Sequence, residues 1–173
     1  KEPLKNSAQI AHSLTMIGGS RPDNNTTFNA SLVTDDHKAG IYVFGQNRHR
    51  SSYDHDGDGF TELGKIDAKT LGFRSYIKTS TYSKLTFEYH NISEFRRGGN
   101  KFDLEPFETD ITEQTKHIIN SGGLTYDLFG KEYKHKFSFF ASAQHVDRNS
   151  YYGAQQDPNA YGKTDDLTFV GGG

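Results

Sequence analysis

The residues best suited to chemistry form an acidic run at positions 53–62, with the sequence YDHDGDGFTE. Aspartates occupy alternate positions in this run, and a glycine follows two of them. Calcium takes about 6–8 oxygen ligands, and glycine lets a short loop fold back around the ion. The spacing therefore predicts a calcium site. Its expected ligands are the carboxylates of Asp54, Asp56, Asp58 and Glu62 and the backbone carbonyl of Phe60.

The acidic run is not an EF-hand. An EF-hand loop needs a bidentate glutamate at its twelfth position, where counting from Asp54 places Lys65. No helical periodicity flanks the run either. We therefore expect a calcium loop between two strands, completed by a further carboxylate such as that of Asp67 or one from a neighbouring loop. The alternative is a solvated acidic turn that holds no ion.

Two adjacent pairs of side chains are candidates for binding a substrate. Arg96 and Arg97 carry guanidinium groups, which bind carboxylate and catecholate oxygens well, so this pair predicts attraction of an anionic chelate. Solvated loop charge, or contact with anionic lipid headgroups, is the alternative for this pair. Tyr151 and Tyr152, followed by Tyr161, predict either stacking against a substrate or an aromatic belt at a membrane interface.

The sequence offers no support for catalysis. Its Ser, His and Asp residues form no nucleophile-elbow sequence, and no P-loop or GxGxxG pattern occurs, so we expect a protein that is not an enzyme. The eight histidines form no HxxH or HxxxH pair, and the absence of cysteine excludes a Cys-based zinc site and a disulfide framework. A net charge of −2 argues against a nucleic-acid partner.

Composition predicts that strands position these residues. The chain has 173 residues, enough for one domain, and its 13% aromatic residues and 18 glycines favour an all-β fold. No apolar stretch reaches the roughly 18 residues that would predict a transmembrane helix. Apolar and polar residues alternate with the period of a strand in several segments. These are residues 9–17, 26–34, 39–48, 69–79, 84–95, 115–128, 135–147 and, as the start of an eighth strand, 167–170.

The connections between these segments are predicted to alternate in length. Short ones fall at residues 35–38, 80–83 and 129–134, and longer ones at 18–25, 50–67, 96–114 and 148–166. Because successive antiparallel strands put every second connection at the same end, the sheet should carry tight turns at one end and large loops at the other. Outer-membrane barrels have this asymmetry, whereas a soluble β-sandwich has no need of it.

The alternation also predicts which side chains share a face. A basic residue on the lipid side of a membrane barrel costs about 2–4 kcal/mol at the bilayer midplane. We therefore expect charged side chains inside a barrel and apolar ones outside, with a soluble sheet that has one solvated face as the alternative. The inward set is Arg74, Lys78, Glu88 and His90, and the outward set is Leu71, Phe73, Ile77, Leu85, Phe87 and Tyr89.

Five strings in the chain are distinctive. They are FGQNRHR at residues 44–50, the acidic run, TLGFRSY at 70–76, SKLTFEYH at 83–90 and SEFRRGG at 93–99. These strings resemble TonB-dependent outer-membrane receptors, and most closely those for ferric siderophores and vitamin B12. The resemblance covers nearly the whole chain. It implies that residues 1–173 are antiparallel up-and-down strands, a fragment of a larger membrane β-barrel of about 22 strands.

The resemblance also implies a function and a location. Such receptors lie in the cell outer membrane, contact its lipid, and import a metal chelate such as a ferric siderophore, or vitamin B12 (cobalamin). TonB supplies the energy through an N-terminal plug, which is absent from residues 1–173, as are the remaining strands. Calcium orders extracellular loops in the vitamin B12 receptors, and the family orientation places the acidic run outside the cell.

Two other interpretations stay open at the level of sequence. The first is a complete small membrane barrel of about eight strands, whose interior is filled by side chains. The second is a secreted or surface calcium-binding β module that acts in adhesion or association. An isolated set of early barrel strands has unpaired edges, which lipid cannot satisfy, so we do not expect it to insert stably alone.

Overall fold

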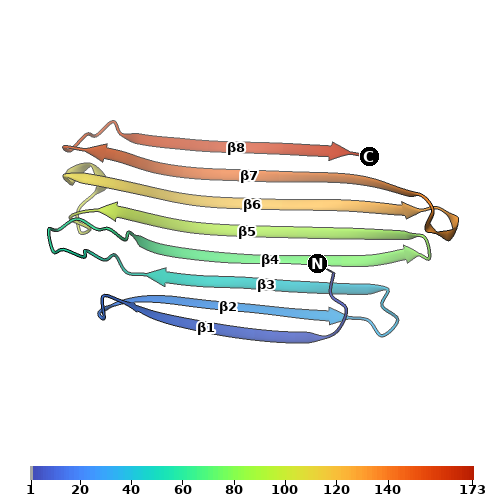
Figure 1. Ribbon diagram of the computed structural model, residues 1–173. Helices are drawn as coiled ribbons and strands as arrows, with labels where there is room; N and C mark the ends of the chain where they lie inside the picture. Colours follow the sequence, from blue (N-terminus) through green and yellow to red (C-terminus); the bar gives the residue numbers. More distant parts are fainter. Residues whose placement is uncertain (1) are drawn as a thin grey trace.

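The computed structural model describes residues 2–173 as one antiparallel sheet in which each strand pairs with the next along the chain (Figure 1). The eight strands are β1 (Ser7–Ile17), β2 (Arg21–Val33), β3 (Ala39–Arg50), β4 (Lys65–Ser80), β5 (Ser83–Gly99), β6 (Ile111–Phe129), β7 (Lys136–Ala154) and β8 (Tyr161–Gly172). Two 3-10 turns, η1 (Pro106–Glu108) and η2 (Lys131–Tyr133), lie in connections. No helix among these residues is long and apolar enough to cross a membrane.

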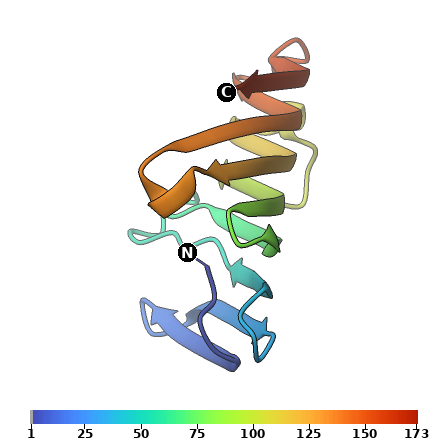
Figure 2. The same ribbon diagram turned by 90° about the vertical axis from the view of Figure 1, so that its right-hand side faces the viewer.

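The sheet is open. Its first and last strands, β1 and β8, form its two edges and do not pair with each other. Figure 2, which looks along the strands, shows a curved layer with these two strands at opposite ends. The predicted all-β, antiparallel, up-and-down order is therefore confirmed. Residues 2–173 do not form the closed eight-stranded barrel that the sequence left open.

Most strands are longer than the alternation predicted. β2 begins at Arg21 rather than near residue 26, and β8 covers Tyr161–Gly172 rather than only 167–170. The early part of β2 looks like a loop in the sequence because it is polar, but its side chains bond those of β3. Arg48 Nη2 lies 2.7 Å from Asp23 Oδ2, and Gln46 Nε2 donates to Asn25 Oδ1 at 2.8 Å.

The predicted alternation of short and long connections is wrong in two places. β1 and β2 are joined by a tight turn at residues 18–20, and the β7–β8 connection at 155–160 is no longer than the β6–β7 connection at 130–135. Residues 51–64 and 100–110 are the two long loops, and both lie at the same end of the sheet, on the left in Figure 1. We call this the loop end and the opposite one the turn end.

The two faces of the sheet differ as predicted. Cross-strand partners project to the same side, and neighbours along a strand project to opposite sides. Phe73 pairs with Tyr89, whereas Arg74 pairs with Glu88. The predicted outward and inward sets therefore lie on opposite faces, which we call the apolar face (the side of Phe73) and the polar face (the side of Arg74).

The apolar face carries a band without charge. On this face no Asp, Glu, Lys or Arg occurs at residues 71–77 of β4, 85–95 of β5, 118–128 of β6 or 137–145 of β7. Many large apolar side chains in this charge-free band are exposed, including Leu71, Phe87, Phe137 and Phe139. The charged residues of this face all lie toward the loop end. They are Lys65, Asp67, Lys69, Arg97, Lys116, Asp147, Lys163 and Asp165.

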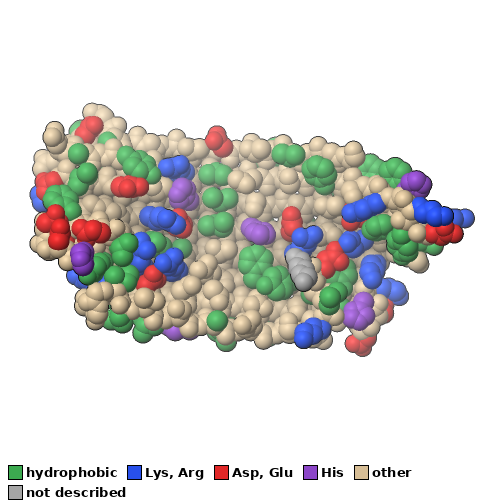
Figure 3. All heavy atoms as spheres, in the orientation of Figure 1, with side chains coloured by type: hydrophobic (Ala, Val, Ile, Leu, Met, Phe, Trp, Pro, Cys, Tyr) green, Lys and Arg blue, Asp and Glu red, His purple; other side chains and the backbone are tan. Residues whose placement is uncertain are grey.

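The polar face holds ion pairs and the start of the chain. Figure 3 shows this face, with basic and acidic side chains spread over it. Lys84 Nζ lies 2.5 Å from Glu2 Oε1, which draws the N-terminal segment across the sheet as far as β5. Among the described residues, only Ile66, Tyr76 and Tyr151 are buried large apolar side chains. The sheet therefore has no continuous apolar core of its own.

Candidate metal and ligand site

The acidic run lies in the β3–β4 loop, whose base is fixed at three points. Tyr53 and Leu63 exchange backbone hydrogen bonds of 2.9 and 3.2 Å, which closes the neck of the loop. Thr61 N–H donates to Gly99 O at 3.1 Å, and Gly99 N–H donates to Thr61 Oγ1 at 3.1 Å. The Tyr53 ring lies against Gly18 of the β1–β2 turn, where a Cβ would be only 2.4 Å away.

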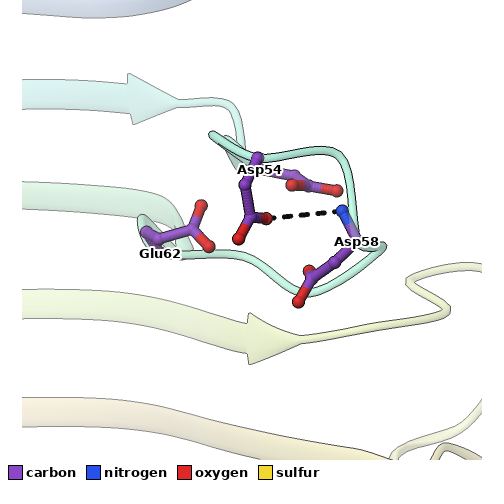
Figure 4. Close-up of side chains that lie close together, drawn as sticks. Asp54, Asp58 and Glu62 are labelled. Atoms are coloured by element: carbon purple, nitrogen blue, oxygen red, sulfur yellow. Dashed lines mark hydrogen bonds between the residues drawn. The ribbon is translucent and has the colours of Figure 1, made fainter.

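The loop brings together the four carboxylates that the sequence predicted. Asp54, Asp56, Asp58 and Glu62 each offer an oxygen, and these oxygens lie within 4.8 Å of one another. Three of the four are labelled in Figure 4, where they point toward the centre of the loop. Asp67, named as an additional ligand, is not in this group. It lies on the apolar face of β4 and pairs with His49 and with Lys65.

Local hydrogen bonds explain this arrangement. Asp54 accepts the backbone N–H of Gly57 at 2.7 Å and that of Gly59 at 2.8 Å. Both glycines have positive φ angles, 78° and 91°, which a side chain would disfavour. Asp58 Oδ1 accepts the N–H of Phe60 at 2.8 Å. Each carboxylate still has lone pairs free, so these bonds shape the loop without exhausting its ligands.

The charge in the loop is not neutralised by the protein. No ion pair of the described residues involves the four carboxylates. Like charges this close repel one another, and a bound cation would relieve the repulsion. Four carboxylates supply much of the roughly 6–8 oxygens that calcium takes, so the residues present fit that ion. The carbonyl of Phe60 stays a predicted ligand.

A cavity of about 440 Å³ borders the acidic loop and reaches the polar face of β4–β6. Phe60 and Glu62 of the loop line this cavity, together with Arg50, Arg96 and Glu113 of the strands. Arg50 pairs with Ile66, which pairs with Arg96, so the two arginines flank Ile66 in one register row. Arg50 donates two N–H groups to Gly64 O, at 2.9 and 3.1 Å.

The two arginines predicted to bind a substrate together lie on opposite faces. Arg96 is exposed on the polar face and makes a two-point contact with Glu94, at 2.7 and 3.1 Å. Arg97 also borders the cavity, but its side chain is only 8% exposed on the apolar face. Its Nη2 donates to Leu104 O at 2.8 Å, and its guanidinium lies 5.4 Å from the Phe102 ring centre. Arg97 therefore holds the 100–110 loop.

The two neighbouring tyrosines are divided in the same way. Tyr151 is fully buried, donates its hydroxyl to Asp157 O at 2.9 Å, and packs edge-on against Tyr161. Tyr152 is half exposed on the polar face, with its hydroxyl 3.0 Å from Thr115 Oγ1. Of the four predicted substrate residues, Arg96 and Tyr152 share the polar face with Arg50, and Arg97 and Tyr151 stabilise loops.

Arg50 is the functional candidate that the sequence did not single out. It ends a segment in which Arg48 and Arg50 alternate with histidine and asparagine, so the period of two placed both arginines on one face. The site combines a cluster able to bind a cation with a neighbouring cavity lined by arginines. No protein family, curated protein or solved structure was found to match this chain.

Proposed function

We propose that residues 2–173 are part of the wall of an outer-membrane β-barrel receptor that imports a metal chelate or vitamin B12, powered by TonB. The observation that carries this proposal is the charge-free band on the apolar face. Its stretches on β5, β6 and β7 match the roughly 9–11 residues that a tilted strand needs to cross the hydrocarbon of a bilayer. An exposed apolar surface of this extent needs a nonaqueous surrounding or a partner.

The polar face supports the same proposal because it is suited to line an aqueous interior. Its charges are paired across strands, as in Arg48 with Asp23 and Arg74 with Glu88. Lys84 lies between Glu2 and Asp127 near the turn end. If this face were turned to lipid, each uncompensated basic residue would cost about 2–4 kcal/mol at the midplane.

The loop end is where ligand capture would occur. The acidic loop, ordered by calcium, forms one wall of the cavity, and Arg50 and Arg96 stand opposite. Guanidinium groups bind carboxylate and catecholate oxygens through charge-assisted hydrogen bonds, so the cavity suits an anionic chelate. Tyr152 lies further along the polar face and offers an exposed ring for stacking.

A calcium-binding β module that acts in adhesion is the second candidate. The acidic loop alone favours it, because such a module needs the ion but no membrane. The two candidates differ in what covers the charge-free band. A module that is monomeric and soluble without detergent, with Leu71, Phe87 and Phe139 buried against another sheet, would replace the barrel proposal.

Site-directed labelling tests the proposal directly, since the chain has no cysteine of its own. Single cysteines at Phe87 and Glu88, which project to opposite faces, would carry spin labels in vesicle-bound protein. The label at residue 87 should be relaxed by oxygen dissolved in lipid and the label at 88 by a water-soluble nickel complex. Equal exposure of both labels to the nickel complex would contradict a lipid-facing band.

A further inference from the structure

Three lysines of the apolar face have no charged partner. Lys69, Lys116 and Lys163 are exposed and form no ion pair with any described residue. They belong to alternate strands, β4, β6 and β8. Lys69 and Lys116 lie next to the loop-end border of the charge-free band, and Lys163 lies in the row of Lys116, one step beyond Asp165 on β8. A lysine in this position can keep its alkyl chain on the apolar surface and its ammonium group in water.

The register places these ammonium groups within reach of shared ligands. Lys116 pairs with Asn149, which pairs with Lys163, so two strand spacings of about 4.8 Å separate the two lysines. Lys69 lies in the row of Ile118, one step of the alternation away from Lys116. The three lysines therefore form a belt that crosses five strands beside the band.

The acidic side chains of the same zone are already engaged. Asp165 lies 2.8 Å from His145 Nε2, and Asp147 accepts a hydrogen bond from Asn149. Asp67 is held by His49 and Lys65. The zone holds five basic residues (Lys65, Lys69, Arg97, Lys116 and Lys163) and three acidic ones (Asp67, Asp147 and Asp165), so its net charge is positive. Its complement is a set of anions at the same height as the border of the band.

We propose that Lys69, Lys116 and Lys163 bind the phosphate groups of anionic lipids in the leaflet at the loop end. This inference rests on the proposed function, since it requires the charge-free band to lie in hydrocarbon. Lipid phosphates lie just outside the hydrocarbon, and an anionic membrane surface attracts each nearby lysine. The belt is thus a headgroup contact that fixes the depth of the sheet and favours anionic lipid.

Vesicle flotation of the full chain tests the belt. The partition constant would be measured with vesicles of phosphatidylcholine alone and with equal parts phosphatidylcholine and phosphatidylglycerol. Replacing all three lysines by glutamine should weaken binding to the mixed vesicles at least about tenfold and leave binding to phosphatidylcholine unchanged. A control variant, Lys78→Gln, Lys131→Gln and Lys134→Gln, changes the same charge at the turn end and should retain wild-type preference.

The outcomes separate the lipid proposal from the proposed function. If the chain binds both kinds of vesicle equally, the headgroup proposal fails while the band stands. Association with a vesicle needs only the exposed band and the belt, not the closed wall of a stably inserted barrel, so if the chain binds neither kind of vesicle, both proposals fail. Equal losses in the belt and control variants would assign the effect to net charge and overturn the belt. Inorganic phosphate added without lipid should not protect the three lysines from acetylation; protection would identify a site for free phosphate instead.

Discussion

The two long loops at the loop end are held by opposite means. Residues 100–110 fold onto the apolar face, where Arg97 donates to Leu104 O and the hydroxyls of Thr109 and Thr112 are hydrogen-bonded, and all three of these polar side chains are buried. Residues 51–64 bury no comparable cluster, and four like-charged groups of this loop converge. The first loop contains its own stabilising contacts, whereas the second concentrates charge that its own residues do not neutralise.

This difference separates structural roles from binding roles. A loop that is satisfied internally has little to gain from a ligand, while a loop with unneutralised carboxylates gains free energy when a cation binds. The same division runs through the adjacent pairs at this end. Arg97 is buried and holds the 100–110 loop, Tyr151 is buried and holds the β7–β8 connection, and Arg96 and Tyr152 remain on the polar face.

The largest expected effect comes from removing the buried ring of Tyr151, whose hydroxyl donates to Asp157 O in the β7–β8 connection. Tyr151→Ala should lower the free energy of unfolding by about 3–5 kcal/mol, because a fully buried aromatic ring is lost. Tyr152→Ala, at the next residue, should cost far less because its ring is half exposed. Denaturant unfolding of the two variants in the same lipid or detergent measures both. Similar losses would remove the distinction between the two tyrosines.

The arginine pair should show the same contrast on a smaller scale. Arg97→Gln should cost about 1.5–3 kcal/mol, because the buried charged group donates to backbone carbonyls of the 100–110 loop. Arg96→Gln should change the free energy of unfolding by less than about 0.5 kcal/mol, as an exposed side chain. The same denaturant titration compares them, and equal costs would mean that Arg96 also carries structure.

Calcium should reverse the effect of one substitution in the acidic loop. Without calcium, Asp56→Asn should raise the free energy of unfolding by a few tenths of a kcal/mol, since it relieves repulsion. At calcium ten times above its dissociation constant, wild type should gain about 1.4 kcal/mol and the variant less. Calorimetric titration measures calcium binding, and thermal unfolding with and without a chelator measures the two changes in stability. If millimolar calcium gives no heat of binding, the prediction of a calcium site in this loop is wrong.

Acid should loosen the 100–110 loop slightly. Lys101 and Asn100 donate to Asp110 and hold the pKa of that carboxyl below its ordinary value. The folded-state pKa is the lower one, so this contribution is present above about pH 4 and is lost as the pH falls through the folded value. Hydrogen exchange of residues 100–110 should accelerate in that window, and Asp110→Asn should abolish the dependence. An unchanged profile in the variant would refute this cause.

The period-two pattern predicted much of the fold. Phe73 with Tyr89, and Arg74 with Glu88, fell on the expected faces because alternation alone determines the side. The extent of the strands was harder to predict, because Asp23 and Asn25 resemble loop residues until their partners on β3 are known. Strand ends depend on cross-strand bonds, which the local sequence does not contain.

The site was predictable where spacing carries the chemistry. Asp54, Asp56, Asp58 and Glu62 converge because Gly57 and Gly59 allow the chain to turn and both donate their N–H groups to the Asp54 carboxylate. The pairs of adjacent residues were predicted less well. Alternation, applied to Arg96 and Arg97, would have separated them, but only the folded 100–110 loop shows which one becomes buried.

The contact between Glu2 and Lys84 bears on the order of assembly. Every strand pairs with its neighbour in sequence, so hairpins can form one after another with little loop-closure entropy. The Glu2–Lys84 contact instead joins residues 82 positions apart, and Lys84 lies on β5, which pairs with β4 and is separated from β2 by β3 and β4. We therefore expect the Glu2–Lys84 ion pair to form late in folding, after the first five strands have paired.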